Sequence, residues 1–338
     1  MKSFGGIIQS NHPRKQRWEI YLSRTVFAFV LGLVCLNFAG CAKLAKVSDS
    51  SIPRLVTPLA TADLNQLLTQ LKPFTELKAC RASRIALRFI EPQAEARWRD
   101  AEAILVLQQP DRIRVVIQIP VTKSRLAEMV SENNHFKVAV YQERPTFIVG
   151  TNDADYTRWR ERLGKDRQSA LANARPFHFT DAMLMRPLHV GESGYAYSLE
   201  EQILDEVEIQ PNQKTPARVL HSYYVVAELA LTAAGQARVL RRFWFDRSSN
   251  LQLKRQQLFD ERGEMVTDVT YDNYQKMGEA QAALLPGVVL VSRPHDSYGA
   301  RFTFSAEHFE VNPELPATAF TLENKENLPE TDLDKPVK

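Results

Sequence analysis

The sequence lacks the features that mark several large classes of protein. It contains only three cysteines in 338 residues, so the disulfide framework of a small secreted domain is excluded. Glycine (13 residues) and proline (18 residues) are no more frequent than average, which excludes collagen-like sequence and long low-complexity linkers. With 44% hydrophobic and 25% charged residues, most of the chain is expected to fold into one or two globular domains.

The sequence also lacks an excess of either charge. It has 43 basic and 40 acidic side chains, a net charge of +3, and no clustered basic face that would indicate nucleic acid as a partner. Motifs of catalysis and metal binding are missing as well: there is no G-x-S-x-G elbow, P-loop, H-E-x-x-H or zinc-spaced cysteine pair. We therefore expect no cofactor, no metal site and no enzyme, although a hydrolase with an unrecognised site remains a minority alternative.

Two weaker polar patterns do not change this expectation. His178 and His189 with Asp181 are separated by Pro187, so they define no dependable common site for a metal. The acidic run from 200 to 208 could attract a cation, but a solvated strand face is the simpler interpretation.

The N-terminus has the pattern of a lipoprotein signal peptide. Basic residues are concentrated in the first two dozen positions, and charge is then absent from Thr25 to Ala42. The apolar core from Thr25 to Leu36 is shorter than the roughly 20 residues of a membrane-spanning helix. It ends in Phe38-Ala39-Gly40-Cys41, which resembles the lipobox that lipoprotein signal peptidase cleaves. We expect residues 1–40 to be removed and Cys41 to be lipidated, the alternatives being an uncleaved anchor or an ordinary secretory signal.

Lipidation at Cys41 predicts a protein of the cell envelope. Several acyl chains on one residue suffice for stable membrane anchoring. In lipoprotein sorting in double-membrane bacteria, which this N-terminus resembles, the residue after the lipidated cysteine selects the membrane. Ala42 stands at this position where Asp would prevent transfer, so the resemblance favours the periplasmic face of the outer membrane. Residues 41–60 are then expected to be a tether without periodicity, and Cys80 a half-buried structural thiol at the start of a strand.

The mature chain is dominated by period-two patterns. A short helix is expected first, with Asp63 as its N-cap and leucines at helical spacing up to residue 71. Alternation then indicates strands at about 83–91, 97–108, 112–119, 125–131, 135–141, 145–150, 199–207, 219–231, 237–246, 250–260, 265–275, 286–293 and 299–310.

Helices are expected between the two runs of strands. Residues 154–174 and 177–185 have helical composition, which predicts a helical insertion near 152–190. The tail 323–338 is charged and punctuated by proline, and we expect it to be flexible.

The order of elements predicts an α+β fold that is mainly β. One antiparallel sheet of about eleven strands tends to curl, and helices on its concave face can cover an apolar interior. We therefore expect an incomplete, half-open β-barrel over residues 61–322 with helices covering the concave face.

Several segments resemble the LolA-like periplasmic lipoprotein carriers. The early strands match in Gln109-Pro110-Asp111-Arg112-Ile113-Arg114, Ile119-Pro120 and Glu128-Met129-Val130-Ser131. The later strands match in Trp244-Phe245-Asp246, Asp260 to Gly263, Val269-Thr270-Tyr271, Leu285-Pro286 and Ala319-Phe320. The resemblance covers roughly residues 61 to 322. It differs at Asn133-Asn134, where relatives tend to have a glycine-containing turn, and in a longer middle section.

The resemblance implies a hydrophobic ligand, namely acyl chains of a lipid or lipoprotein in transit, held against the concave face. Candidates by alternation for lining such a cavity are Ile113, Val115, Ile117, Ile119, Phe243, Phe245, Phe302 and Phe304. Plain core packing between sheet and helices is the equally weighted alternative for each of them. A second functional alternative is an envelope sensor or assembly scaffold that binds a protein partner through the same fold.

Overall fold

Strands dominate the structure, which is a computed structural model. It describes residues 53–90, 99–142, 144–152, 154, 156, 177–209, 216–232, 235–278, 283–296 and 298–335. The predicted signal peptide, Cys41 and nearly all of the predicted helix at 154–174 lie outside these residues. No helix in the described part of the chain is long and apolar enough to cross a membrane.

The described strands form one sheet of sixteen strands. They are β1 (Arg54–Leu55), β2 (Ala79–Ile90), β3 (Arg99–Gln108), β4 (Arg112–Gln118), β5 (Arg125–Glu132), β6 (His135–Val140), β7 (Thr146–Thr151), β8 (Tyr195–Glu208), β9 (Ala217–Leu231), β10 (Ala237–Asp246), β11 (Gln252–Phe259), β12 (Met265–Met277), β13 (Ala283–Arg293), β14 (Tyr298–Phe304), β15 (Phe309–Val311) and β16 (Glu330–Asp332).

Two antiparallel meanders build the sheet. One runs from β8 to β14, the other from β2 to β7, and β14 joins them by pairing with β2, where Phe302 lies opposite Leu87. The strands at the two ends of the sheet, β8 and β16, do not pair with each other in the described structure, so the sheet stays open. This confirms the predicted half-open, mainly β fold.

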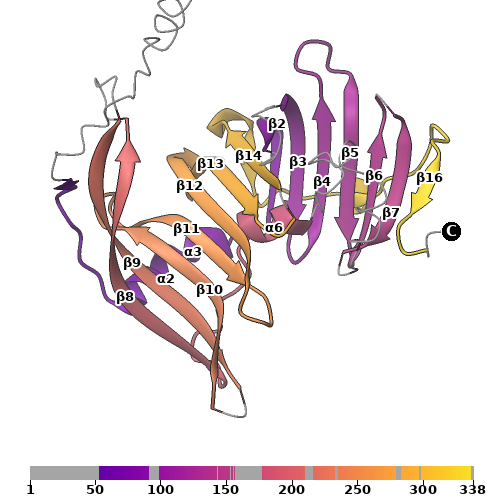
Figure 1. The fold of residues 1–338 in the computed structure, drawn as a ribbon. Coiled ribbons are helices and arrows are strands. Elements are labelled where there is room, and N and C mark those ends of the chain that lie inside the picture. Colours follow the sequence, from indigo (N-terminus) through magenta and orange to yellow (C-terminus); the bar gives the residue numbers. More distant parts are fainter. Residues whose placement is uncertain are drawn as a thin grey trace, which may run out of the picture. The chain divides into compact units, whose positions relative to one another are not determined.

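Three short helices lie within the curve of the sheet (Figure 1). They are α2 (Leu64–Gln70), α3 (Lys72–Thr75) and α6 (Phe177–Met183), and we term them the lid helices. The sheet face that packs against them is termed the inner face, and the opposite face the outer face. Side chains alternate between the two faces along each strand, and the largest hydrophobic cluster lies between the inner face and the lid helices.

The first helix forms as its sequence predicts. Asp63 is the N-cap of α2, and it forms a capping box with Gln66. Leu67 and Leu71 point into the core. Helix α2 ends at Gln70, before Pro73, and Pro73 occupies the first turn of α3, where its missing N–H is not needed.

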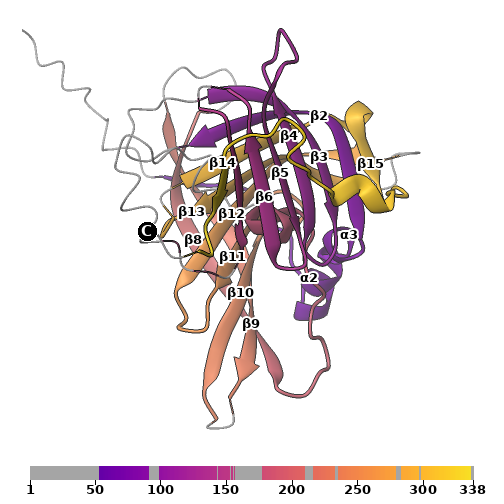
Figure 2. The same cartoon turned by 90° about the vertical axis from the view of Figure 1, so that its right-hand side faces the viewer.

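The C-terminal segment lies along the outer face of β3 to β7 (Figure 2). Phe320 and Leu322 are buried there in a second apolar cluster that includes Phe147. Strand β16 pairs in parallel with β7, and Thr151 donates its N–H (3.2 Å) and hydroxyl (2.8 Å) to the Asp334 carboxylate. Residues 323–335 contact the sheet through Leu328, Leu333 and the pairing of β16 with β7, and the flexibility of this tail stays a prediction.

Three predictions need correction. The tether does not extend to residue 60, because β1 pairs in parallel with β9 and the Ala60 N–H donates to the Arg247 carbonyl. The count of about eleven strands is too low: the thirteen predicted segments become sixteen strands, because β1 and β16 carry no alternation signal of their own and one segment divides in two. The predicted strand at 299–310 is two strands, β14 and β15, which pair with successive parts of β2.

Candidate functional site

Seven of the eight predicted interior residues meet in one cluster. Those from β4, β10 and β14 are all buried on the inner face: Ile113, Val115, Ile117, Phe243, Phe245, Phe302 and Phe304. Ile119 does not join them, because it lies just beyond the end of β4 and is only partly buried in the turn to β5. Strands far apart in the sequence therefore present a single apolar face.

The lid helices fill most of the space above this face. Phe179 of α6 packs edge-on against Phe302 with ring centroids 5.1 Å apart, and Phe74 of α3 lies 5.4 Å from the ring of Tyr271. The apolar cavity that remains beneath them has a volume of about 20 Å³, room for one water-sized sphere. Its lining includes Met183, Leu285 and, of the predicted residues, Phe304. In this conformation the predicted residues pack as core, so a larger ligand requires the lid helices to move.

Helix α6 is fixed to the sheet by buried polar contacts. The Tyr271 hydroxyl donates to the Ala182 carbonyl at 2.8 Å and lies 2.7 Å from the side-chain amide of Gln256. Burial raises the pKa of Tyr271, so its hydroxyl keeps the proton that this bond needs. The imidazole of His178 contacts the Tyr298 hydroxyl and stacks on that ring. These contacts hold one face of α6 directly over β12 and β14.

A buried ion pair fixes the chain that follows α6. The side chain of Glu228 on β9 is fully buried and pairs with Arg241 on β10. Arg241 also donates to the carbonyls of Arg186 (2.9 Å) and Pro187 (3.0 Å). We term these two charged side chains and the segment 186–189 the latch. The latch joins the chain that leaves α6 to the inner face of the sheet.

The remaining lone pairs of Glu228 are also occupied. It accepts hydrogen bonds from the backbone N–H of His189 (3.1 Å) and the hydroxyl of Tyr197 (2.8 Å). Burial alone would raise the pKa of Glu228, but hydrogen bonding to Arg241 and the charge of Arg241 outweigh it and lower the pKa. Glu228 is therefore ionised in the folded protein, as the latch requires.

An open groove separates α2 and α3 from the chain that follows α6. It has a volume of about 480 Å³ and lies between α2 and α3 on one side and residues 187–190 on the other. Leu68 and the stem of Lys72 line the first side, and Leu188 and Val190 line the second. Val190 is 56% exposed. Leu68 and Leu188 connect this groove to the apolar cluster, since both pack in it.

The apolar inner face continues past the lid helices onto the edge strand β8. Leu199 lies opposite Val226 of the core, which places Leu199, Ile203 and Val207 on the inner face by alternation. They are 38%, 56% and 70% exposed. We term these three residues the apolar stripe. It is an uncovered part of the face on which the predicted interior residues lie. Glu201 and Asp205 lie between its members on the same face, where they pair with Arg247 and Arg218.

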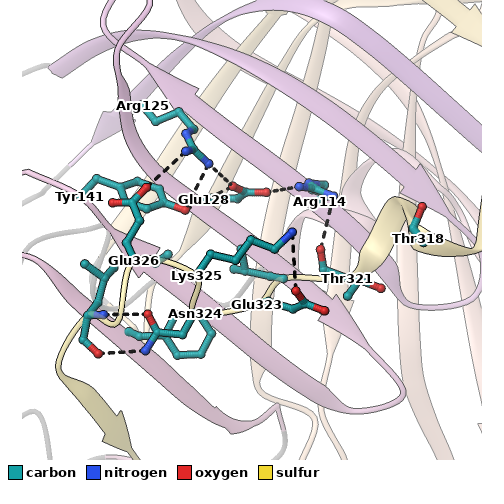
Figure 3. A pocket seen from close by; sticks show the side chains of 14 residues that line it. Arg114, Arg125, Glu128, Tyr141, Thr318, Thr321, Glu323, Asn324, Lys325 and Glu326 are labelled. Carbon is teal, nitrogen blue, oxygen red and sulfur yellow. Dashed lines mark hydrogen bonds and ion pairs between the residues drawn. The ribbon is translucent and has the colours of Figure 1, made fainter.

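A polar pocket on the outer face has a different character (Figure 3). It has a volume of about 340 Å³, and Glu128 of β5 lies buried at its centre, paired with Arg114 and near Arg125 at 3.4 Å. Arg114 also donates to the Ala319 carbonyl at 3.1 Å, and Arg125 pairs with Glu326. Because these charges pair with one another and with the C-terminal segment, the pocket joins that segment to the sheet.

The comparisons find similar solved structures but no close relative. A LolA superfamily protein from Nitrosomonas europaea is 12% identical, with a TM-score of 0.40, covering 78% of this chain and 99% of that chain. A DUF1329 family protein from Desulfovibrio piger is 10% identical, with a TM-score of 0.43, covering 76% and 95%. A candidate outer membrane lipoprotein-sorting domain from Vibrio parahaemolyticus is 10% identical, with a TM-score of 0.39, covering 75% and 94%. No family model and no curated protein matches.

Proposed function

We propose that this chain is a lipid-anchored envelope protein that carries a hydrophobic ligand, the acyl chains of a lipid or lipoprotein, and that it is not an enzyme. The observation that carries the proposal is the continuous apolar inner face. It runs from β4 through β14 to β10 and, within the part of the chain that the structure describes, is covered by helices of seven, four and seven residues. It continues onto β8 as the exposed apolar stripe, with Glu201 and Asp205 between the three residues of the stripe.

The energetics of an acyl chain suit this arrangement. Burial contributes about 0.8 kcal/mol per methylene group, so one long chain gains enough to offset the displacement of a short helix. An acyl chain that enters at the groove would replace the contacts of Phe74 and Phe179 with the sheet. The latch and the Tyr271 contact set the free energy that entry must overcome. The contacts between the inner face and the ligand would be apolar, so selectivity among ligands would come from polar residues at the rim of the binding site.

The proposed location follows from the N-terminus. Removal of residues 1–40 and lipidation of Cys41 would place the folded part in the periplasm, held at the outer membrane by acyl chains. Lipid or lipoprotein ligands would then be within reach of the inner face.

A second candidate function, an envelope scaffold that binds a protein partner, is favoured by one observation. The edge strand β8 presents both the apolar stripe and an unpaired backbone edge among the described residues. Such an edge accepts an extended peptide as an additional strand.

Two matched variants separate these functions from a purely structural role of the stripe. Val207→Asp places a charge on the stripe, and Val121→Asp places the same charge at a turn residue that is 90% exposed and distant in the fold. We expect Val207→Asp to weaken binding of a fluorescent fatty acid to residues 42–338 by about tenfold, and Val121→Asp to leave it unchanged. Equal binding by both variants and the unsubstituted protein would contradict a carrier that uses the stripe. Loss of a copurifying envelope protein from Val207→Asp, with fatty acid binding intact, would support the scaffold.

A further inference from the structure

Three metal-ligating side chains converge on the outer face at the edge of the sheet. They are Glu206 and Glu208 of β8 and His221 of β9, and their ligand atoms all lie within 4.8 Å of one another. The strand register produces this arrangement. His221 lies opposite Leu204, so the next two outward positions along β8 are Glu206 and Glu208.

His221 itself points to a missing ligand. It is only 7% exposed, and neither of its ring nitrogens makes a hydrogen bond in the described structure. Its Nε2 lies 3.0 Å from a carboxylate oxygen of Glu208, without the geometry of a hydrogen bond. A buried imidazole without a hydrogen-bond partner is costly, and a cation between Nε2 and the carboxylates would give Nε2 a ligand bond.

The surroundings of the cluster favour a cation. The Tyr223 hydroxyl donates to one oxygen of Glu206 at 2.8 Å, which orients this carboxylate as the outer partners of metal ligands do. Asp246 of β10 lies opposite Tyr223 in the register of β9 and β10. Asp246 is itself buried, and its carboxylate is already occupied by Ser248 and Ser249. Negative charge is thus concentrated around His221.

We propose that Glu206, Glu208 and His221 form a binding site for a divalent transition metal of the zinc type. One imidazole nitrogen with two carboxylates is a donor set for such ions, whereas calcium and magnesium prefer oxygen alone. The Glu208 side chain is 43% exposed, so the site is open to solvent on one side and has an entry path. Bound metal would link the edge strand β8 to β9 directly behind the apolar stripe.

The test is a zinc titration of the full chain, purified in detergent and stripped with a chelator. Glu208→Gln and His221→Gln remove ligands, and circular dichroism monitors their folding. Glu200→Gln is the matched control for charge, since it removes a carboxylate from the same strand outside the cluster. His135→Gln removes an exposed histidine on the distant strand β6.

We expect one saturable zinc ion per chain, at least about tenfold weaker binding in both ligand variants, and unchanged binding in both controls. We also expect zinc to raise the Tm of the unsubstituted chain and of the controls, and not that of the ligand variants. The partly exposed Glu208 keeps the test valid if the His221 variant fails to fold. Absence of saturable binding, or equal affinity in the Glu208 variant and the unsubstituted chain, would overturn the proposal.

Discussion

Replacement of Arg241 by methionine should reveal how strongly the latch holds the lid. The Arg241 side chain is 9% exposed and its partner Glu228 is fully buried, so the substitution leaves an ionised carboxylate without a counter-charge. Removal of one partner of a buried ion pair costs about 3–5 kcal/mol. The carbonyls of Arg186 and Pro187 lose their charged donor at the same time. We therefore expect a loss of at least about 3 kcal/mol in the free energy of unfolding.

A double-mutant cycle in urea separates the ion pair from simple packing. Glu228→Met in the Arg241→Met background removes the unpaired charge, and this removal should restore stability. Against this gain, Tyr197 and His189 lose their acceptor, which costs about 1–3 kcal/mol. Apart from that cost, the double variant should be at least as stable as Arg241→Met alone. Hydrogen exchange should also show faster exchange in residues 184–189 of Arg241→Met. A cost below about 1 kcal/mol for Arg241→Met, or strict additivity of the two single changes, would refute the latch.

Three further predictions concern titration, reactivity and the C-terminal segment. The pKa of Glu228 is lower in the folded than in the unfolded protein, so its contribution to stability is complete above the unfolded pKa of about 4.5 and is lost as the pH falls through the folded pKa. Glu228→Gln should flatten this part of an acid-unfolding curve. A curve unchanged by Glu228→Gln would contradict this prediction. Burial raises the pKa of the Cys80 thiol to about 12, so a thiol reagent at pH 8 should label Cys80 only after urea unfolding, and rapid native labelling would show that the core is open. Phe320→Ala should cost about 3 kcal/mol in urea unfolding, whereas a loosely held tail would give under about 0.5 kcal/mol.

Most of the sheet could be predicted from the sequence, because alternation in a strand directly records which face is buried. The run Ile113, Val115, Ile117 and the pairs Phe243 with Phe245 and Phe302 with Phe304 all mark the inner face correctly. Even the acidic strand β8, where alternation is loose, includes the whole predicted range 199–207. The short strands β1 and β16 were not predictable, since each depends on a partner far away in sequence.

The lid and its latch could not be predicted for a different reason. Glu228 stands among apolar residues at an inward position, which indicates a buried charge, but nothing local identifies Arg241 as its partner. The metal cluster has the same difficulty, because His221 and the two glutamates meet only through the register of β8 with β9. Periodicity also shows which side chains share a face of the sheet, but not what packs on that face. The sequence alone therefore cannot show whether an acyl chain or the ring of Phe179 packs on Phe302.

Mass spectrometry of organic extracts tests the carrier proposal most directly. Residues 42–338 would be produced in a bacterial periplasm, purified without detergent, and compared with an unrelated periplasmic protein prepared in the same way. The account predicts an enriched lipid in a fixed ratio to the protein, and a higher content in Arg241→Met, whose lid is loosened. No enrichment in either form, with both shown to be folded, would contradict a ligand held between the inner face and the lid helices.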